Sequence, residues 1–171
     1  EILDSQRLTF ITTNSAHTYW TYRDEPVGFE YDLAAAFAES LGVELEVVVA
    51  PWSGLFDALE AGRGDIVGAS LTATRDRRRR LEFSEGYMVV RQEVVVHASN
   101  RRVRRLVDLQ GMSVHLRAGT SYEARLRELQ AGGLDVDIIL HEDLPTEELI
   151  RRVADEEIEV TVADTNIALL N

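Results

Sequence analysis

Short apolar segments alternate with amphipathic ones in the first part of the chain. Residues 8–13, 43–50 and 65–69 are rich in β-branched side chains and too short to be buried helices, so each predicts a strand. Two helical segments lie between these strands. The order β-α-β-α-β favours a parallel sheet covered by helices, and such sheets bind ligands beyond the carboxyl ends of their strands.

The two helices are predicted from apolar residues spaced three or four apart. The first starts near Tyr31 and stops at Gly42, a residue type that commonly terminates helices. The second follows Ser53, which can cap it, and ends at Gly62 and Gly64. The apolar residues are Leu33, Phe37 and Leu41 in the first helix and Leu55, Phe56 and Leu59 in the second.

The same alternation returns after an extended, valine-rich segment at residues 87–97. The pattern predicts a short helix at 106–109, a strand at 112–116, a helix capped by Thr120 or Ser121, a strand at 136–140, a helix at 145–154 and a strand at 158–162. We therefore expect two small α/β lobes. Lobe one covers 1–95, lobe two covers 96–163, and 164–171 starts a return segment to lobe one.

Composition and charge exclude several classes of protein. Thirty acidic residues against eighteen basic ones, all of them arginine, give a net charge of -12, so the chain as a whole repels nucleic acid and anionic lipid. The absence of cysteine excludes disulfides, Cys-ligated zinc and thiol catalysis. No apolar stretch approaches the ~20 residues of a membrane-spanning helix. No basic and apolar leader opens the chain, so a signal peptide was either removed or never present.

Enzyme motifs are absent from the sequence. The four histidines, His17, His97, His115 and His141, show neither HExxH nor another paired metal spacing. Phosphate-binding loops, dinucleotide fingerprints and the nucleophile elbow of hydrolases are missing too. We therefore expect no catalytic residues, no metal and no cofactor in this chain.

Several segments stand together in the order and spacing of one family: Gly28-Phe29-Glu30-Tyr31-Asp32-Leu33, Leu41-Gly42-Val43, Trp52, Gly64-Asp65-Ile66, Leu71-Thr72-Ala73-Thr74-Arg75-Asp76-Arg77 and Phe83-Ser84. They resemble the family 3 extracellular solute-binding proteins, which have the two-lobed α/β type II periplasmic binding fold. Within this family, the segments Thr18-Tyr19, 26–33 and 161–164 are most similar to the regulatory domain of membrane-bound lytic transglycosylase F. Two departures stand out. Arg75 replaces a common proline, and the sequence stops before the segment that normally returns to complete lobe one.

The resemblance implies a ligand that carries both a carboxylate and an ammonium group. Arg77 matches the arginine that pairs with the carboxylate through two N–H donors, and Asp164 matches the acid that receives the ammonium. In a turn of lobe two, the Thr120 hydroxyl and nearby backbone amides hold the carboxylate from the other side, with Ser121 and Arg117 as further contributors. The simpler interpretations are a solvated basic run around Arg77 and ordinary helix caps at Thr120 and Asp164.

Four residues of lobe one complete the implied site. Trp52 stands where the family has an aromatic residue that packs on the ligand, and Tyr19, or alternatively Trp20, forms the opposite wall. Ser70 and Thr72 lie at alternating positions where a strand leaves lobe one, so both can direct a polar group to the same place. Core packing of the aromatic residues and strand-end capping are the simpler interpretations.

The family resemblance implies a non-catalytic, periplasmic binding module. It would capture an amino-acid-like zwitterion or a cell-wall stem peptide in a cleft between the lobes and report occupancy by hinge closure. It would regulate a lysozyme-like lytic transglycosylase domain beyond this chain, in a parent protein tethered to the outer membrane. The alternatives are an amino-acid receptor that serves an ABC permease, a sensor-kinase input domain, and an enzyme similar to cyclohexadienyl dehydratase. We expect a monomer without a nucleic-acid partner.

Overall fold

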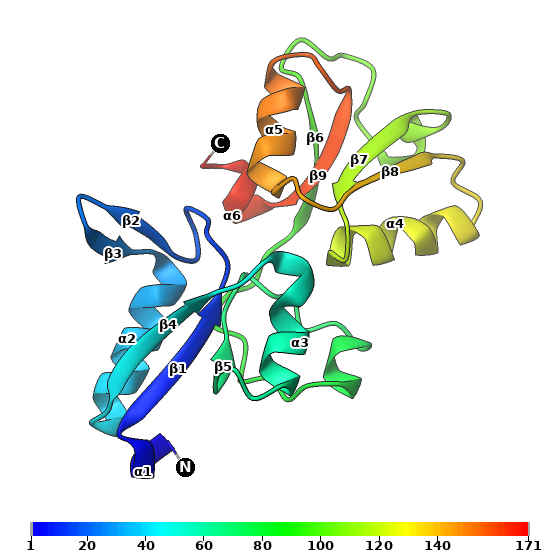
Figure 1. Ribbon diagram of the computed structural model, residues 1–171. Helices are drawn as coiled ribbons and strands as arrows, with labels where there is room; N and C mark the ends of the chain where they lie inside the picture. The colour runs from blue at the N-terminus through cyan, green and yellow to red at the C-terminus, as the bar shows by residue number, and fades with distance from the viewer. Residues whose placement is uncertain (1, 171) are drawn as a thin grey trace. The chain divides into compact units, whose positions relative to one another are not determined.

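The chain folds into two compact units that divide between Thr72 and Ala73, as the computed structural model of residues 2–170 shows (Figure 1). Each unit is an α/β structure with its own sheet and its own buried core. The lobe limits expected from the sequence, 1–95, 96–163 and 164–171, stay a prediction. Residues 92–95, assigned there to lobe one, form part of a strand in the sheet of unit two, and residues 1 and 171 lie outside the described part.

Unit one, which includes the short helix α1 (Ile2–Ser5), is built on three parallel strands in the order β4-β1-β5. They are β1 (Arg7–Thr12), β4 (Glu44–Val49) and β5 (Ile66–Val67). The central strand β1 is the most buried, and its apolar side chains face both sides of the sheet because successive residues point in opposite directions. The predicted parallel sheet is therefore present.

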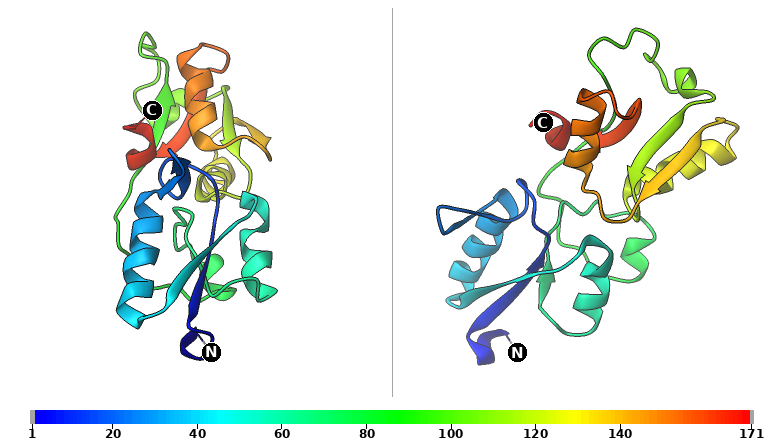
Figure 2. Two further views of the ribbon diagram at one scale, coloured as in Figure 1. Left: turned by 60° about the vertical axis from the view of Figure 1, so that its left-hand side comes forward. Right: turned by 45° about the horizontal axis from the view of Figure 1, so that its top comes forward.

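Helices α2 (Phe29–Leu41) and α3 (Leu55–Glu60) cover the two faces of this sheet, as Figure 2 shows. Ile11 packs in one core cluster with residues of α3, which the short 3-10 helix η1 (Trp52–Gly54) precedes. The next residue back along β1, Phe10, lies on the other side, where Phe10 and Glu30 of α2 both approach Gly68. Both predicted helices are confirmed.

Helix α2 meets the sheet through its small side chains rather than its large ones. Glu30, Ala34 and Ala38 are buried, whereas Leu33 and Phe37 are 40% and 44% exposed. The predicted apolar face is therefore directed away from the sheet. Alanine side chains let the helix backbone come close to the strands, and this close approach outweighs the larger apolar area of the other face.

A hairpin that the sequence pattern did not reveal precedes α2. Strands β2 (Trp20–Tyr22) and β3 (Glu25–Val27) pair antiparallel around Arg23 and Asp24, which both have positive φ angles. Such a turn normally selects glycine or asparagine. Because the hairpin is short, largely exposed and lacks that signal, alternation of apolar residues could not predict it.

Unit two is built on a four-stranded sheet in the order β6-β9-β7-β8. Strand β9 (Val160–Asp164) runs antiparallel to β6 (Gln92–Val96) and parallel to β7 (Ser113–Arg117), which pairs in parallel with β8 (Asp137–His141). Every residue of β9 is buried. The predicted strands at 112–116, 136–140 and 158–162 are confirmed with shifts of one or two residues, whereas only 92–96 of the extended segment 87–97 forms a strand.

Helices cover both faces of this second sheet. On one face α4 (Ser121–Ala131) packs Tyr122 and Leu126 against Val162 and neighbouring strand residues. On the opposite face α5 (Thr146–Ala154) and α6 (Thr165–Ala168) pack against Ala163, the residue that follows Val162. Two short 3-10 helices, η2 (Arg77–Arg79) and η3 (Leu106–Leu109), lie in the connections. The carboxyl end of β9 is thus enclosed by helices.

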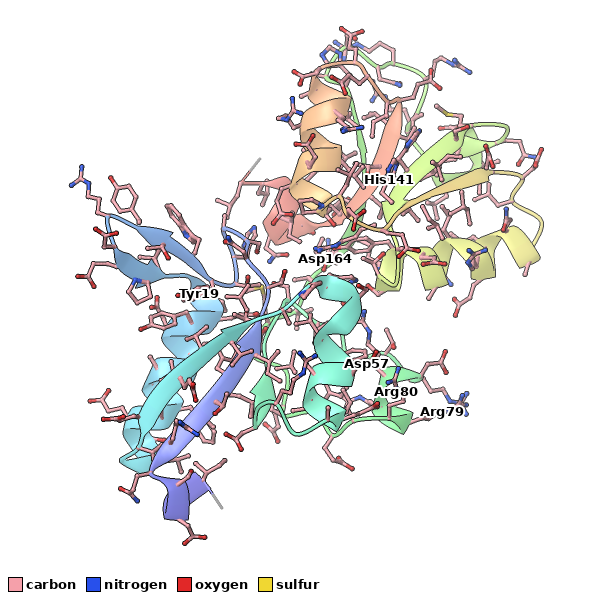
Figure 3. The ribbon with its side chains drawn as sticks, in the orientation of Figure 1. Tyr19, Asp57, Arg79, Arg80, His141 and Asp164 are labelled. Atoms are coloured by element: carbon pink, nitrogen blue, oxygen red, sulfur yellow. The ribbon has the colours of Figure 1, made fainter. Side chains whose placement is uncertain are left out.

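Two histidines of unit two bind each other. Nδ1 of His115 and Nε2 of His141 lie 2.9 Å apart in one hydrogen bond, and the two rings stack. His141, the last residue of β8, is labelled in Figure 3. Within residues 2–170, no group of three or more histidine or acidic side chains is arranged to hold a metal ion. Over the same residues, no helix has the length and apolar character needed to cross a membrane.

Gly28 is the glycine of unit one whose replacement we expect to be most damaging. Its φ angle is +144°, and a Cβ atom there would overlap the Thr18 carbonyl group, which accepts a hydrogen bond from Tyr31 at the start of α2. Gly28→Ala should therefore cost unit one about 3 kcal/mol or more, measured by hydrogen exchange of the β1 amides. The control is Gly42→Ala, because Gly42 also has a positive φ of +69° but open space around it. Gly42→Ala should cost unit one only about 1 kcal/mol. Equal destabilisation by the two substitutions would show that the overlap with the Thr18 carbonyl group does not matter.

Candidate functional site

Asp164 ends the fully buried strand β9 and is itself only 4% exposed (Figure 3). Its backbone N–H donates a hydrogen bond to the Tyr122 hydroxyl at 3.0 Å. Burial raises the pKa of the Asp164 carboxyl group, while a hydrogen bond from Tyr122 and the charge of Arg77 act in the opposite direction. Among the described residues, Oδ1 of Asp164 has no hydrogen-bond partner. A buried carboxylate oxygen of Asp164 thus lacks a hydrogen-bond donor among the described residues.

Arg77 differs from the other arginines of its basic run. It is half-buried in η2, whereas Arg78, Arg79 and Arg80 are exposed. Its Nη2 donates a hydrogen bond to the Gly119 carbonyl oxygen at 3.0 Å. Burial lowers the pKa of Arg77, and electrostatic interactions with Tyr122 and with Asp164 oppose this shift. The structure therefore brings Arg77 together with Tyr122 and Asp164, and the solvated interpretation fits only the rest of the run.

The turn before α4 is organised by its own side chains. The Thr120 hydroxyl donates to the Arg117 carbonyl oxygen at 2.8 Å and accepts from the Glu123 N–H at 3.4 Å, so Thr120 caps α4. The Gly119 N–H donates to Oε2 of Glu123 at 2.8 Å. The simpler, capping interpretation of Thr120 is therefore present in the structure. A ligand carboxylate at this turn would have to displace Glu123 or use other amides.

The two remaining candidates of unit two flank the same turn. Arg117 is partly buried, which lowers its pKa, while electrostatic interactions with Glu147 and with Tyr122 oppose that shift. Ser121 accepts a hydrogen bond from Nε2 of Gln92 at 3.1 Å. Unit two thus combines two partly buried guanidinium groups with one buried carboxylate. Such an arrangement complements a small molecule that carries both charges.

The four candidates of unit one follow the carboxyl ends of its three parallel strands. Tyr19 (Figure 3) comes after β1, Trp52 after β4, and Ser70 and Thr72 after β5. The Tyr19 ring lies 5.7 Å from that of Tyr31, and Trp52 packs against the core cluster around α3. The carboxyl ends of parallel strands meet at one edge of a sheet, so these residues share that edge.

Ser70 has a strained backbone that a buried acid supports. Its φ angle is +51°, a region that non-glycine residues adopt at a cost of roughly 1–2 kcal/mol. Oε1 of Glu30, a residue of α2 that is 4% exposed, accepts the Ser70 N–H at 2.7 Å. Glu30 therefore fixes the chain where it leaves β5 toward Thr72.

Sequence reasoning missed two residues of the candidate site, Glu30 and Tyr122. An acid in the first turn of a helix is usually exposed, where it interacts with the helix dipole, and so Glu30 carried no distinct signal. Tyr122 stands at an apolar position of α4 and is 6% exposed, which is typical of a core residue. Only the fold shows that its hydroxyl reaches the end of β9.

The fold and the site agree with one family of binding proteins. The model of the bacterial extracellular solute-binding proteins, family 3, matches residues 8–106, and the chain belongs to this family. Its fold is the type II periplasmic binding fold, as predicted. Membrane-bound lytic murein transglycosylase F of Desulfosudis oleivorans is 47% identical over 165 residues, which are 96% of this chain and 36% of that protein. The Erwinia tasmaniensis protein of the same name is 35% identical over 167 residues, 96% of this chain and 34% of its own. The chain thus spans about a third of these relatives.

Solved structures give the same result. An ancestral amino acid-binding protein, described as a precursor of cyclohexadienyl dehydratase, is 27% identical with a TM-score of 0.88, over 99% of this chain and 75% of its own. An ancestral arginine-binding protein bound to arginine is 27% identical with a TM-score of 0.84, over 96% of this chain and 73% of its own. These neighbours confirm the predicted α/β fold class and the family, and they bind amino acids.

Removal of the Glu30 carboxylate should destabilise unit one. Glu30→Ala leaves the Ser70 N–H without its acceptor, and a hydrogen bond to a charged group contributes about 1.5–3 kcal/mol. Glu30→Gln keeps an acceptor oxygen and should cost less. The measurement is hydrogen exchange at Ser70 and along β1.

The matched control is Asp32→Ala, which removes an exposed acid from the same first turn of α2. It should cost less than about 0.5 kcal/mol, as surface substitutions usually do. Ser70→Gly should stabilise unit one, because glycine adopts the positive φ angle without strain. If Asp32→Ala destabilised unit one as much as Glu30→Ala does, the hydrogen bond between Glu30 and Ser70 would be unimportant for stability.

Proposed function

We propose that this chain is a ligand-binding module for an amino-acid-like zwitterion or a cell-wall stem peptide, and that it regulates a peptidoglycan-cleaving domain of the same protein. The observation that carries the proposal is the presence of two opposite charges that influence each other in unit two. Arg77 is half-buried and Asp164 is buried, the charge of each influences the pKa of the other, and one oxygen of Asp164 has no partner among the described residues. Such groups are complementary to a carboxylate and an ammonium group on one molecule.

The proposed roles follow the chemistry of each side chain. Arg77 holds the ligand carboxylate with its planar guanidinium group, assisted by Arg117 and the turn that contains Thr120 and Ser121. Asp164 receives the ammonium group. The polar groups of Ser70 and Thr72 add hydrogen bonds, and Trp52 and Tyr19 supply apolar surface. Closure of the two lobes on the ligand, which the family resemblance implies, belongs to this proposal.

The regulatory part of the proposal is supported by the curated relatives. Both are named as membrane-bound murein transglycosylases, and this chain matches only about a third of their length. We infer that ligand occupancy in this module controls lytic activity located in another part of the protein. A periplasmic location, with a tether to the outer membrane through the parent protein, fits this role.

A second candidate function is that of an amino-acid receptor for an ABC importer. The observation that favours it is the likeness to solved amino-acid-binding and arginine-binding proteins over almost the whole chain. The two functions differ in the ligand. Free amino acids would be the ligands of a receptor, whereas stem peptides would be those of a transglycosylase regulator.

A thermal-shift screen tests the proposed ligand class. The panel contains L-arginine, L-glutamine and a purified stem peptide, each with and without N-acetylation. A ligand that binds only the folded state stabilises it by RT ln(1 + [L]/Kd), about 2.7 kcal/mol at a hundredfold excess over Kd, so a true ligand raises the melting temperature. Arg77→Ala should abolish the shift, and Arg77→Lys should weaken it, because the two-pronged contact with the carboxylate is lost.

Two variants show whether the effect is specific. Arg79→Ala removes an exposed arginine from the same 3-10 helix and should leave the shift unchanged. Asp164→Asn should weaken binding of the free amine far more than binding of its N-acetylated form, because only the amine forms a charge-assisted bond. A panel member that binds both the Arg77 and the Asp164 variants as well as the unaltered chain would rule out the proposed site.

The isolated chain should not cleave peptidoglycan. Glycoside cleavage normally requires a pair of carboxyl groups flanking the scissile bond, and no such pair with an identifiable glycosidase context is evident in the sequence. The measurement is muropeptide release from purified sacculi, with a lysozyme as the positive control. Release that a single carboxylate substitution within this chain abolishes would contradict the prediction.

A further inference from the structure

Tyr122 has an apolar ring and a polar end in different environments. The residue is 6% exposed, and its ring belongs to the core cluster of unit two, which includes Leu126 of α4 and Val162 of β9. Its hydroxyl leaves this core and reaches the backbone of Asp164, 42 residues away in the sequence. The ring therefore anchors the hydroxyl at a fixed place beside the end of β9.

The hydroxyl contacts Asp164 in two ways. It accepts the backbone N–H of Asp164 at 3.0 Å, and its interaction with the carboxyl group of the same residue lowers the pKa of that group. The other carboxyl oxygen, Oδ1, is buried and has no hydrogen-bond partner among residues 2–170. Tyr122 thus occupies one side of Asp164 and leaves an acceptor on the other.

A buried carboxylate needs such support to stay charged. Burial is the largest influence on Asp164 and raises its pKa, whereas the hydrogen bond from Tyr122 ranks first among the opposing influences, ahead of the charge of Arg77. A phenylalanine at this position would keep the ring in the core and remove only the hydroxyl. The carboxyl group would then lose both its positional constraint and part of what favours its ionised form.

We propose that Tyr122 is a positioning residue of the binding site, whose hydroxyl holds Asp164 charged and oriented so that Oδ1 faces the ammonium group of the ligand. This inference rests on the proposed role of Asp164 and assigns to that site a residue which the family resemblance did not indicate. Tyr122 itself need not touch the ligand. Its contribution is the order that it imposes on the acid.

The first test needs no ligand. The Asp164 carboxyl group is titrated by carbon-13 NMR in the unaltered chain and in Tyr122→Phe, with Tyr22→Phe as the control, because Tyr22 lies on the exposed hairpin of unit one. The midpoint for Asp164 should move to higher pH in Tyr122→Phe and stay unchanged in Tyr22→Phe. An unchanged midpoint in a folded Tyr122→Phe protein overturns the proposal, whereas a purely structural role of the ring predicts no such shift.

The second test uses L-arginine and L-glutamine, with their N-acetylated forms, as probes. Loss of one hydrogen bond to a charged group corresponds to about a ten- to 150-fold weaker binding of the free amines at pH 7. The loss should grow as the pH falls, because the Asp164 carboxyl of the variant takes up its proton at higher pH. Equal weakening for the N-acetylated forms counts against the proposal.

The two proposals fail in distinguishable ways. If the Asp164 midpoint rises in Tyr122→Phe while Asp164→Asn leaves probe binding unchanged, the positioning contact is real and the proposed ligand role of Asp164 is wrong. If Asp164→Asn abolishes binding while Tyr122→Phe changes neither the midpoint nor binding, the ligand role stands and the role of Tyr122 is wrong. If none of the probes bind, the titration alone decides the role of Tyr122.

Discussion

A strand that is buried along its whole length and ends in a carboxylate imposes the main constraint on unit two. Strand β9 pairs with β6 on one side and β7 on the other, and helices cover both of its faces. Its last residue, Asp164, therefore loses most of its hydration, and the protein must compensate the charge. The hydroxyl of Tyr122 and the charge of Arg77 do so, and each is brought there by a different segment of the chain.

This compensation is incomplete, and a site that binds a cationic group requires such an unsatisfied acid. If the protein itself had satisfied every oxygen of Asp164, the residue would be a structural ion pair with nothing to offer a ligand. One oxygen remains without a partner among the described residues, and the pKa of the carboxyl group stays above its ordinary value. The free protein carries an electrostatic cost that a cationic group on a ligand would remove.

Much of the fold could be predicted from the sequence, because alternating and four-residue spacings reflect which faces are buried. The strands β1, β4, β7, β8 and β9 and the helices α4 and α5 follow these spacings. The exposed hairpin β2–β3 and the buried face of α2 could not be predicted in this way. The hairpin buries too little to leave a pattern, and in α2 the small residues Ala34 and Ala38 decide the packing against the larger Leu33 and Phe37.

The candidate site was only partly accessible from the sequence. Arg77 and Asp164 could be named because they stand within recognisable motifs, and the structure brings them together with Tyr122 in unit two. The supporting residues Glu30 and Tyr122 could not, since each carries a polar group at a position where sequence patterns indicate an ordinary helix surface or core. Their roles depend on contacts 40 and 42 residues away along the chain.

The distribution of tryptophan between the two units has a spectroscopic consequence. Both indoles of the chain, Trp20 in β2 and Trp52 in η1, belong to unit one, whereas Arg77 and Asp164 belong to unit two. Tryptophan fluorescence of this chain therefore originates in unit one alone. A change in tryptophan emission on binding would therefore report a change in the surroundings of Trp20 or Trp52, both residues of unit one.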